Sequence, residues 1–182
     1  MIEKNDRVKI QDNFLTLKEF VALRDIITHK DFAWNFNPTI VSPDEEDKEN
    51  TPGYFHHTVY NSNVPYSQVY NSFVPIMEAL DIDVLLRIKI NLYPRLPKPF
   101  TSDFHADVID SNPDIPIQIW TTSIFYINTN NGYTEFEDGT IVESVANRIV
   151  TFPANSDHRV VTQTDEKRRM VINFNYLKGY RT

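Results

Sequence analysis

Apolar and polar residues alternate from Val84 to Tyr93, and this run constrains the fold more than any other feature of the chain. One face of the expected strand is apolar: Val84, Leu86, Ile88, Ile90 and Leu92. The other face begins with Leu85 and then carries polar side chains, those of Arg87, Lys89, Asn91 and Tyr93. Because successive side chains of a strand point to opposite faces, the pattern predicts a strand that is covered on one side and lines something polar on the other.

Strand patterns separated by turn residues continue to the end of the chain. We expect strands over residues 117–128, 134–137, 140–145, 149–152, 159–162 and 169–177. The Asp138-Gly139 pair between two of these runs is typical of a hairpin turn. Three further strands are expected before residue 84, at 8–15, 32–36 and 54–60.

Two helices are expected in the first half of the chain. Apolar residues recur at helical spacing over 17–28, where Thr16 is a suitable N-cap, and over 66–81, where Pro75 should break or kink the helix. Each helix has one apolar stripe that suits the outer face of a sheet. The pattern predicts a mainly β fold with flanking α, a β-sandwich or jelly roll with the N-terminal helices packed on one sheet.

Composition excludes some chemistry and disfavours some partners. A chain of 182 residues without an internal repeat fits one domain, residues 1–182. It has no cysteine, so any metal must bind to histidines and carboxylates. The net charge of −7 argues against a protein that grips a phosphate backbone. We expect a cytoplasmic protein without membrane contact, because neither a signal-peptide pattern nor a membrane-length apolar run is visible.

The segment His105-Ala106-Asp107 suggests a metal site. In a strand the side chains of His105 and Asp107 would point the same way, within reach of one ion. The best candidate for a third ligand is His158, and two histidines with one carboxylate are the ligands of non-haem Fe(II) oxygenases. The alternative is that His105 and Asp107 form a hydrogen-bonded pair at the surface. The adjacent His56 and His57 would face opposite sides of a strand, so we expect no metal role for them, although one could face a substrate.

Several motifs occur together in a characteristic order after residue 84. They are Leu92-Tyr93-Pro94, His105-Ala106-Asp107, the run Thr122 to Asn128, Gly132-Tyr133-Thr134-Glu135-Phe136, Ile149 to Pro153, His158-Arg159-Val160 and Arg169 to Asn175. In this set the chain resembles the 2-oxoglutarate- and Fe(II)-dependent dioxygenases, in their prolyl-4-hydroxylase-like branch, over a core of about residues 84–178. The resemblance implies a double-stranded β-helix, with His105, Asp107 and His158 as iron ligands and 2-oxoglutarate and O2 as co-substrates.

The resemblance also implies that a basic residue of the last core strand binds the distal carboxylate of 2-oxoglutarate. Arg169 and Arg168 are the candidates; Tyr126 matches a tyrosine that joins the same carboxylate, and Tyr93 one near the co-substrate. Both tyrosines can also be interpreted as core aromatics with satisfied hydroxyls. Strand parity separates the arginines. Met170, Ile172, Phe174 and Tyr176 form an apolar face for the helices, so Arg169, Val171, Asn173 and Asn175 should line the cavity, with Arg168 in solvent at the strand entrance.

The resemblance implies an Fe(II)- and 2-oxoglutarate-dependent hydroxylase acting on a C–H bond of a peptidyl or free amino acid, with release of succinate and CO2. A nucleic-acid dealkylating dioxygenase is one alternative. Against it, Asn175 stands six residues after Arg169, where that branch has a second arginine, and the net charge is negative. A non-catalytic metal-binding jelly-roll module is the other alternative, although structural metals usually have four protein ligands.

Residues 42–53 contain no apolar side chain beyond prolines. This composition is typical of a solvated loop. Because long loops in compact domains are often functional, a lid that closes over the active site is the more specific hypothesis.

Overall fold

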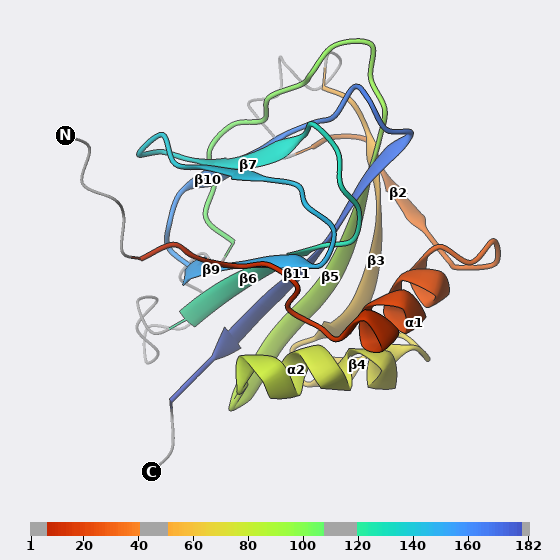
Figure 1. The fold of residues 1–182 in the computed structure, drawn as a ribbon, viewed down its shortest axis with the longest axis vertical. Coiled ribbons are helices and arrows are strands. Elements are labelled where there is room, and N and C mark those ends of the chain that lie inside the picture. The colour runs from red at the N-terminus through yellow and green to blue at the C-terminus, as the bar shows by residue number, and fades with distance from the viewer. Residues whose placement is uncertain (1–6, 41–50, 108–119, 180–182) are drawn as a thin grey trace.

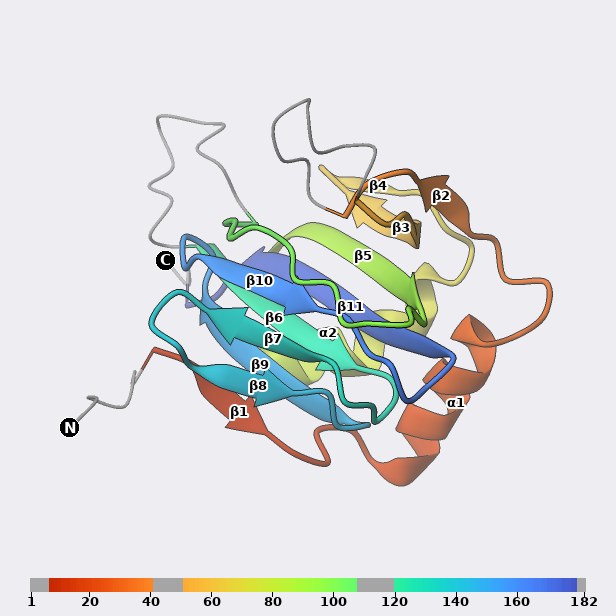
Figure 2. The ribbon, with the colours of Figure 1, turned by 90° about the horizontal axis from the view of Figure 1, so that it is seen from above.

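The computed structural model describes residues 7–40, 51–107 and 120–179, and its strands pair antiparallel in two sheets that face each other (Figures 1 and 2). The larger sheet contains, in spatial order, β1 (Lys9–Gln11), β9 (Arg148–Pro153), β6 (Trp120–Tyr126), β11 (Arg168–Leu177), β5 (Val84–Pro94), β3 (Tyr54–Asn61) and β2 (Asn35–Asn37), and β4 (Val64–Pro65) pairs with β3. The smaller sheet contains β10 (His158–Val161), β7 (Tyr133–Phe136) and β8 (Ile141–Glu143). The expectation of a mainly β fold is confirmed.

Helix α1 (Leu17–Ile27) begins where the sequence predicts. The hydroxyl of Thr16 accepts a hydrogen bond from the Glu19 amide at 3.4 Å, and the Thr16 amide donates to the Glu19 carboxylate at 3.0 Å. This reciprocal pair is a capping box, which satisfies amides that have no partner inside the helix.

The helix expected over 66–81 is shorter and divided. A 3₁₀ turn, η2 (Tyr70–Phe73), leads into α2 (Val74–Leu80), so residues 66–69 are not helical. Pro75 lies in the first turn of α2, where its missing N–H removes no hydrogen bond. Pro75 therefore sets the boundary between η2 and α2.

Two hydrophobic clusters lie on opposite faces of the larger sheet. The helix-side cluster joins the buried residues of α1, η2 and α2 to the sheet, and its central members from β5, β6 and β11 are Ile88, Ile90, Phe125, Met170, Ile172, Phe174 and Tyr176. The inter-sheet cluster includes Tyr93, Ile124, Tyr126, Phe136, Phe152, Val160 and Val171. Figure 1 shows both helices on the side of the larger sheet that faces away from β7 and β10.

Alternation in β5 is interrupted, which corrects one expectation. Leu85 packs against the helix-side cluster and does not share a face with Arg87 and Lys89. The reason is a register shift in the β5–β11 pair, where Asn175 opposes Arg87 but Tyr176 opposes Leu85. Because Leu86 is an extra residue in the pairing, Leu85 points to the face opposite to the one that regular alternation predicts.

Other expected strands are shorter than predicted. The first covers only Lys9–Gln11, and the second covers Asn35–Asn37. The rings of Phe32 and Trp34, with centroids 5.1 Å apart, come before the second strand and pack against the helix-side cluster. Residues 117–119 of the strand expected over 117–128 lie outside the described residues, as do residues 42–50 of the acidic stretch, interpreted as a solvated loop or, more specifically, as a lid. None of the helices in the described residues is long and apolar enough to span a membrane.

Thr16→Ala should lower the free energy of unfolding by about 1 kcal/mol, because it removes the side-chain acceptor of the cap. Urea unfolding of the variant measures this loss. Thr16→Ser, which keeps the hydroxyl, is the matched control and should stay close to wild type. Equal losses in the two variants would mean that the hydroxyl of Thr16 does not contribute to the free energy of unfolding.

Candidate active site

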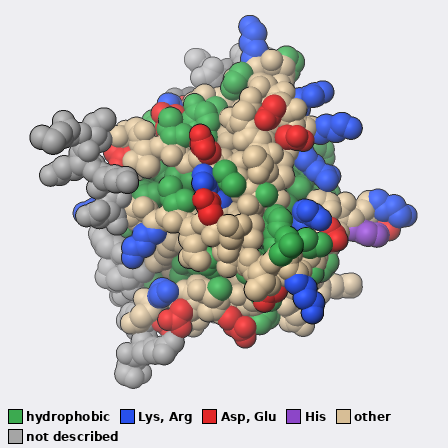
Figure 3. All heavy atoms as spheres, in the orientation of Figure 1, with side chains coloured by type: hydrophobic (Ala, Val, Ile, Leu, Met, Phe, Trp, Pro, Cys, Tyr) green, Lys and Arg blue, Asp and Glu red, His purple; other side chains and the backbone are tan. Residues whose placement is uncertain are grey.

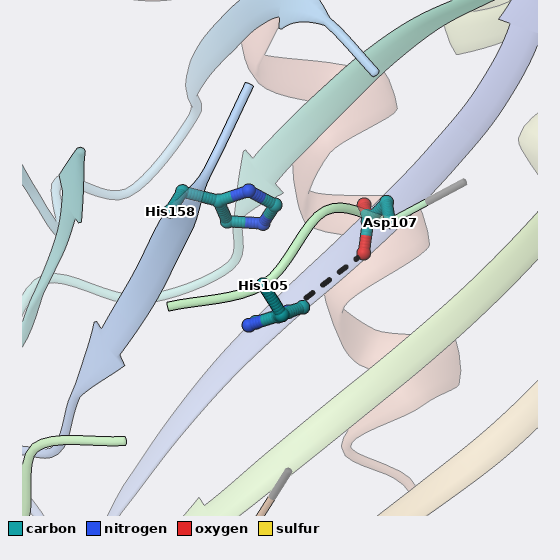
Figure 4. Close-up of side chains that lie close together, drawn as sticks. All are labelled: His105, Asp107 and His158. Atoms are coloured by element: carbon teal, nitrogen blue, oxygen red, sulfur yellow. Dashed lines mark ion pairs between the residues drawn. The ribbon is translucent and has the colours of Figure 1, made fainter. Parts of the chain in front are cut away.

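His105, Asp107 and His158 converge on one point between the two sheets (Figure 4). One potential ligand atom from each lies within 4.8 Å of the other two, and His105 Nε2 is 4.0 Å from Asp107 Oδ1. His158 is the first residue of β10, whereas His105 and Asp107 belong to the segment that follows β5. The sequence prediction that these three residues lie together agrees with this geometry.

The segment that carries His105 and Asp107 is not a strand, contrary to expectation. It forms an isolated bridge to β10, in which the amide of each histidine, 105 and 158, donates to the carbonyl of the other at 3.0 Å. Two backbone hydrogen bonds thus hold the segment beside His158. A second isolated bridge, between Thr101 and Val161, and the hydrogen bond from the Ser102 amide to the Val160 carbonyl at 3.0 Å hold the preceding part of the segment against β10.

The tautomer of His158 is determined by its backbone. Its Nδ1 lies 3.0 Å from the carbonyl oxygen of Ser156, which can only accept a hydrogen bond, so Nδ1 carries the proton and donates. In the neutral imidazole this tautomer leaves the lone pair of Nε2 available to a metal. Ligating histidines in metalloproteins are typically oriented by such a bond.

Asp107 is held by residues from two strands of the larger sheet. Arg87 Nη2 is 3.5 Å from its Oδ1, and Asn175 Nδ2 donates to its Oδ2 at 3.3 Å. Asn175 is itself fixed, because it accepts from Arg87 Nε at 2.9 Å and donates to Thr122 Oγ1 at 2.9 Å. This network orients a carboxylate whose side chain is only 6% exposed.

The electrostatics of the site favour ligands in the correct protonation states. Burial by itself raises the pKa of Asp107, but the nearby His158, Arg87 and His105 and the hydrogen bond from Asn175 outweigh it and leave that pKa below its usual value. Burial, together with His158, lowers the pKa of His105 in spite of the opposing charge of Asp107. An ionised carboxylate and a neutral imidazole are the forms that bind metals.

These donors fit a divalent iron. Two imidazoles and one carboxylate match the facial triad of non-haem Fe(II) enzymes, which leaves three coordination positions for other molecules. A closed structural site would normally have a fourth protein ligand. Among the described residues the metal-ligand cluster contains three.

A cavity of about 340 Å³ lies beside the three residues. Its wall is formed largely by the polar face of β5 and the inward face of β11, and includes Arg87, Lys89, Asn91, Tyr93, Arg169, Val171 and Asn173. Alternation predicts these residues on the lining faces of both strands, but it also predicts Leu85 and Asn175 there, and these two are not among the residues described as lining the cavity. Its size is at the lower end of the range for small-molecule sites in proteins.

Arg169 lies at one end of this cavity and is 1% exposed. Its Nε donates to Ser144 Oγ at 2.8 Å and its Nη2 to Thr134 Oγ1 at 3.2 Å. The guanidinium lies 5.6 Å from the ring centres of both Tyr93 and Tyr126. Within residues 7–40, 51–107 and 120–179, no carboxylate lies within 4.0 Å of it.

A buried cation without an anion is costly in free energy. Burial lowers the pKa of Arg169, although the two tyrosines act in the opposite direction, and a guanidinium nevertheless stays protonated in proteins. The cavity is therefore complementary to a ligand that carries a carboxylate.

The other residues singled out in the sequence fall in different environments. Arg168 is exposed, and Asn173 lines the cavity with an amide oxygen that has no hydrogen-bond partner in the described ranges. Tyr93 lines the cavity beside Arg169. Tyr126 is fully buried, and its hydroxyl donates to Thr134 Oγ1 at 2.8 Å. Of the adjacent histidines, His57 contacts Ala33 and Ser67; neither lines the cavity.

Sequence reasoning missed the residues that support these side chains. In the sequence Gly132 is only one residue of a motif, but in the structure a Cβ there would lie 2.9 Å from Arg169 Cδ and 2.8 Å from the Val161 carbonyl oxygen. The glycine is thus needed for close approach to the arginine. Alternation places Arg87 and Asn175 on the polar faces of their strands, but it does not show that they contact Asp107. No sequence pattern marks Ser144, because its contact partner Arg169 is 25 positions away.

His158→Ala should weaken binding of Fe(II) by at least about a hundredfold, since even residues that only orient a ligand contribute tenfold to a hundredfold. Anaerobic calorimetric titration measures the affinity, and circular dichroism checks the fold. His29→Ala is the control, because His29 is exposed and pairs only with Asp31 in the part of the chain described. Unchanged iron affinity in His158→Ala would exclude His158 as a ligand.

The lowered pKa of His105 gives a pH prediction. The folded protein keeps this imidazole neutral below about pH 6.5, the value of an unperturbed histidine, whereas the unfolded chain takes up a proton there. The metal-free protein should therefore lose stability relative to His105→Gln as the pH falls through that value. Parallel urea titrations of the two proteins between pH 5 and 8 test this. A constant difference would contradict the lowered pKa.

Neither a protein-family model nor a curated protein matches the chain. Solved structures do match. A prolyl-4-hydroxylase from Pseudomonas putida has a TM-score of 0.57 at 16% identity, over 96% of this chain and 95% of that one. An oxidoreductase of the 2OG-Fe(II) oxygenase family from Burkholderia pseudomallei has 0.61 at 10% identity, over 98% and 90%.

A prolyl hydroxylase from Trichoplax adhaerens, solved with a peptide fragment of the hypoxia inducible factor oxygen degradation domain, has a TM-score of 0.61 at 13% identity, over 96% of this chain and 84% of that one. At these identities the likeness concerns the fold. The chain has the fold of the 2-oxoglutarate- and Fe(II)-dependent oxygenases, in the form found in prolyl hydroxylases.

Proposed function

We propose that this chain is an Fe(II)- and 2-oxoglutarate-dependent dioxygenase that hydroxylates a C–H bond of a peptidyl or free amino acid and releases succinate and CO2. One observation carries the proposal. The buried guanidinium of Arg169, which has no carboxylate partner among the described residues, lines the same cavity as the cluster of His105, Asp107 and His158. A metal and a small dicarboxylate are together complementary to this cavity.

The triad would hold the iron, with His158 bound through Nε2 because its Nδ1 donates to Ser156. Arg87 and Asn175 would keep the Asp107 carboxylate oriented through their hydrogen bonds. When bound with 2-oxoglutarate and O2, the iron supplies the oxidising power for the hydroxylation. The protein contributes orientation and exclusion of water.

Arg169 would bind the distal carboxylate of 2-oxoglutarate. A guanidinium has five N–H donors in a planar fork, and the bonds to Ser144 and Thr134 leave donors free for a carboxylate. Thr134 Oγ1 accepts from both Arg169 and Tyr126, so its own proton is available to the same carboxylate. Tyr93 and Asn173 would line the path between Arg169 and the metal.

The two facing sheets support a double-stranded β-helix as the finer description of the fold. A nucleic-acid substrate is disfavoured, because acidic and basic side chains are interspersed on the face seen in Figure 3 and the chain carries a net charge of −7. In addition, Asn175 stands where that branch has an arginine and is committed to Asp107. A purely structural metal is disfavoured because the cluster among the described residues offers three ligands.

The test is anaerobic addition of Fe(II) and 2-oxoglutarate, which should produce a visible metal-to-ligand charge-transfer band. Admission of O2 should then yield succinate. His105→Ala, which lacks one ligand, should give neither signal, and a protein with no band at saturating concentrations would contradict the proposal. A charge-transfer band without succinate on addition of O2 would limit the function to binding.

Arg169→Ala should weaken 2-oxoglutarate binding by roughly thirtyfold to several thousandfold, because removal of one partner from a desolvated charge pair costs about 2–5 kcal/mol. Arg168→Ala is the matched control and should change the affinity by a few-fold at most, because the exposed charge contributes little. Titration of both variants with 2-oxoglutarate gives the comparison. A larger loss in Arg168→Ala would refute the assignment.

A further inference from the structure

Lys89 is a second cation of the cavity without a carboxylate partner. Its Nζ donates to the Tyr54 hydroxyl at 2.9 Å and lies 5.3 Å from the centre of that ring. In the part of the chain that the structure describes, no carboxylate lies within 4.0 Å of Nζ. The Tyr54 oxygen also accepts from Asn37 Nδ2 at 3.3 Å, so its own proton remains free to donate. Lys89 and Tyr54 together offer several donors to an anion.

Asn91 adds an independent sign of a ligand. It follows Lys89 on the cavity face of β5, is 6% exposed, and its amide oxygen has no hydrogen-bond partner among the described residues. A buried acceptor without a donor costs about 1–3 kcal/mol. A ligand that supplies an N–H or O–H would remove this cost. The wall formed by Lys89, Tyr54 and Asn91 therefore suits a molecule with both a carboxylate and a nearby donor.

With a metal and 2-oxoglutarate bound, the charges of the cavity also favour a ligand that carries a carboxylate. This step rests on the proposed function. Asp107 and one carboxylate of 2-oxoglutarate balance the metal, and the other carboxylate balances Arg169. Arg159 has its own partner, because its Nε donates to Glu135 at 2.9 Å. Lys89 remains without a carboxylate partner in the part of the chain that the structure describes, and Arg87 would share Asp107 with the metal. The excess charge beside the metal is positive.

We propose that Lys89 and the Tyr54 hydroxyl bind a carboxylate of the prime substrate, while the amide oxygen of Asn91 accepts a hydrogen bond from the same molecule. The substrate is thus an amino acid or peptide residue with a free carboxylate, either an α-carboxylate or an acidic side chain, and an N–H of the same molecule donates to Asn91. This inference narrows the substrate class of the proposed function, and it places the specificity on β3 and β5 of the larger sheet, whereas the candidate ligand His158 comes from β10 of the smaller sheet.

The experiment uses protein loaded with 2-oxoglutarate and with Zn(II) in place of iron, so that binding is measured without turnover. The probes are matched pairs. Free L-amino acids are compared with their α-carboxamides, and doubly capped peptides containing Asp or Glu are compared with the Asn or Gln forms. Saturation-transfer NMR finds the binders and calorimetry gives their affinities. The first set of pairs tests an α-carboxylate and the second an acidic side chain.

At least one carboxylate probe should bind about tenfold or more tightly than its amide, and Lys89→Met should remove this preference without weakening the amide. Lys18→Met, which removes an exposed charge on α1, is the matched control and should keep the preference. Three results would overturn the inference: equal binding of acid and amide throughout the panel, a preference that survives in Lys89→Met, or a loss of 2-oxoglutarate affinity in Lys89→Met as large as the loss of probe affinity.

The iron charge-transfer band is measured separately, so failure of the proposed function is distinguishable from failure of this inference. With the band present and no carboxylate preference, only the role of Lys89 is wrong. With the band absent, the panel is repeated with Zn(II) alone. A preference that depends on Lys89 then still supports the carboxylate position.

Discussion

Burial of the Arg169 guanidinium is the constraint on which the rest of the site depends. An arginine that is 1% exposed needs acceptors for its N–H groups, aromatic rings to pack against and space for its aliphatic carbons. These come from different parts of the chain. Ser144 and Thr134 accept its hydrogen bonds, Tyr93 and Tyr126 flank the guanidinium, and Gly132 leaves room for Cδ. What the protein itself does not supply, in the described residues, is an anion, and this makes the cavity a site for one.

The candidate metal cluster joins the two sheets at the other side of the same cavity. His158 belongs to the smaller sheet, whereas Asp107 is held by Arg87 of β5 and Asn175 of β11 in the larger one. The bridge between His105 and His158 connects the two groups through the backbone. The relative position of the sheets therefore determines the spacing of the ligands. The packing of the inter-sheet cluster therefore contributes to the spacing of the three candidate ligands.

The residues on the polar face of β5 fall into two groups with different contacts. Tyr93 lies beside Arg169, and Arg87 contacts Asp107 of the candidate metal cluster, so the two ends of the face contact the two parts of the candidate site. Lys89 and Asn91 lie between them and contact neither the metal ligands nor Arg169 by any hydrogen bond in the described structure. Residues of this kind are free to differ between enzymes of one fold, because the fold alone does not determine the substrate.

The sequence by itself determined which side of each strand would be polar. Alternation in β11 placed Arg169 inside and Arg168 outside, because a strand has only two faces and the apolar one must be covered. The order of the motifs also brought His105, Asp107 and His158 together correctly. Only the tertiary structure decided the shift that moves Leu85, the isolated bridge that replaces a strand at His105, and the contacts of Gly132 and Asn175. These depend on partners far away in the chain, such as Arg87 and Asn175, which are 88 positions apart. Local periodicity holds no information about such pairs, since they form only when the sheets pack.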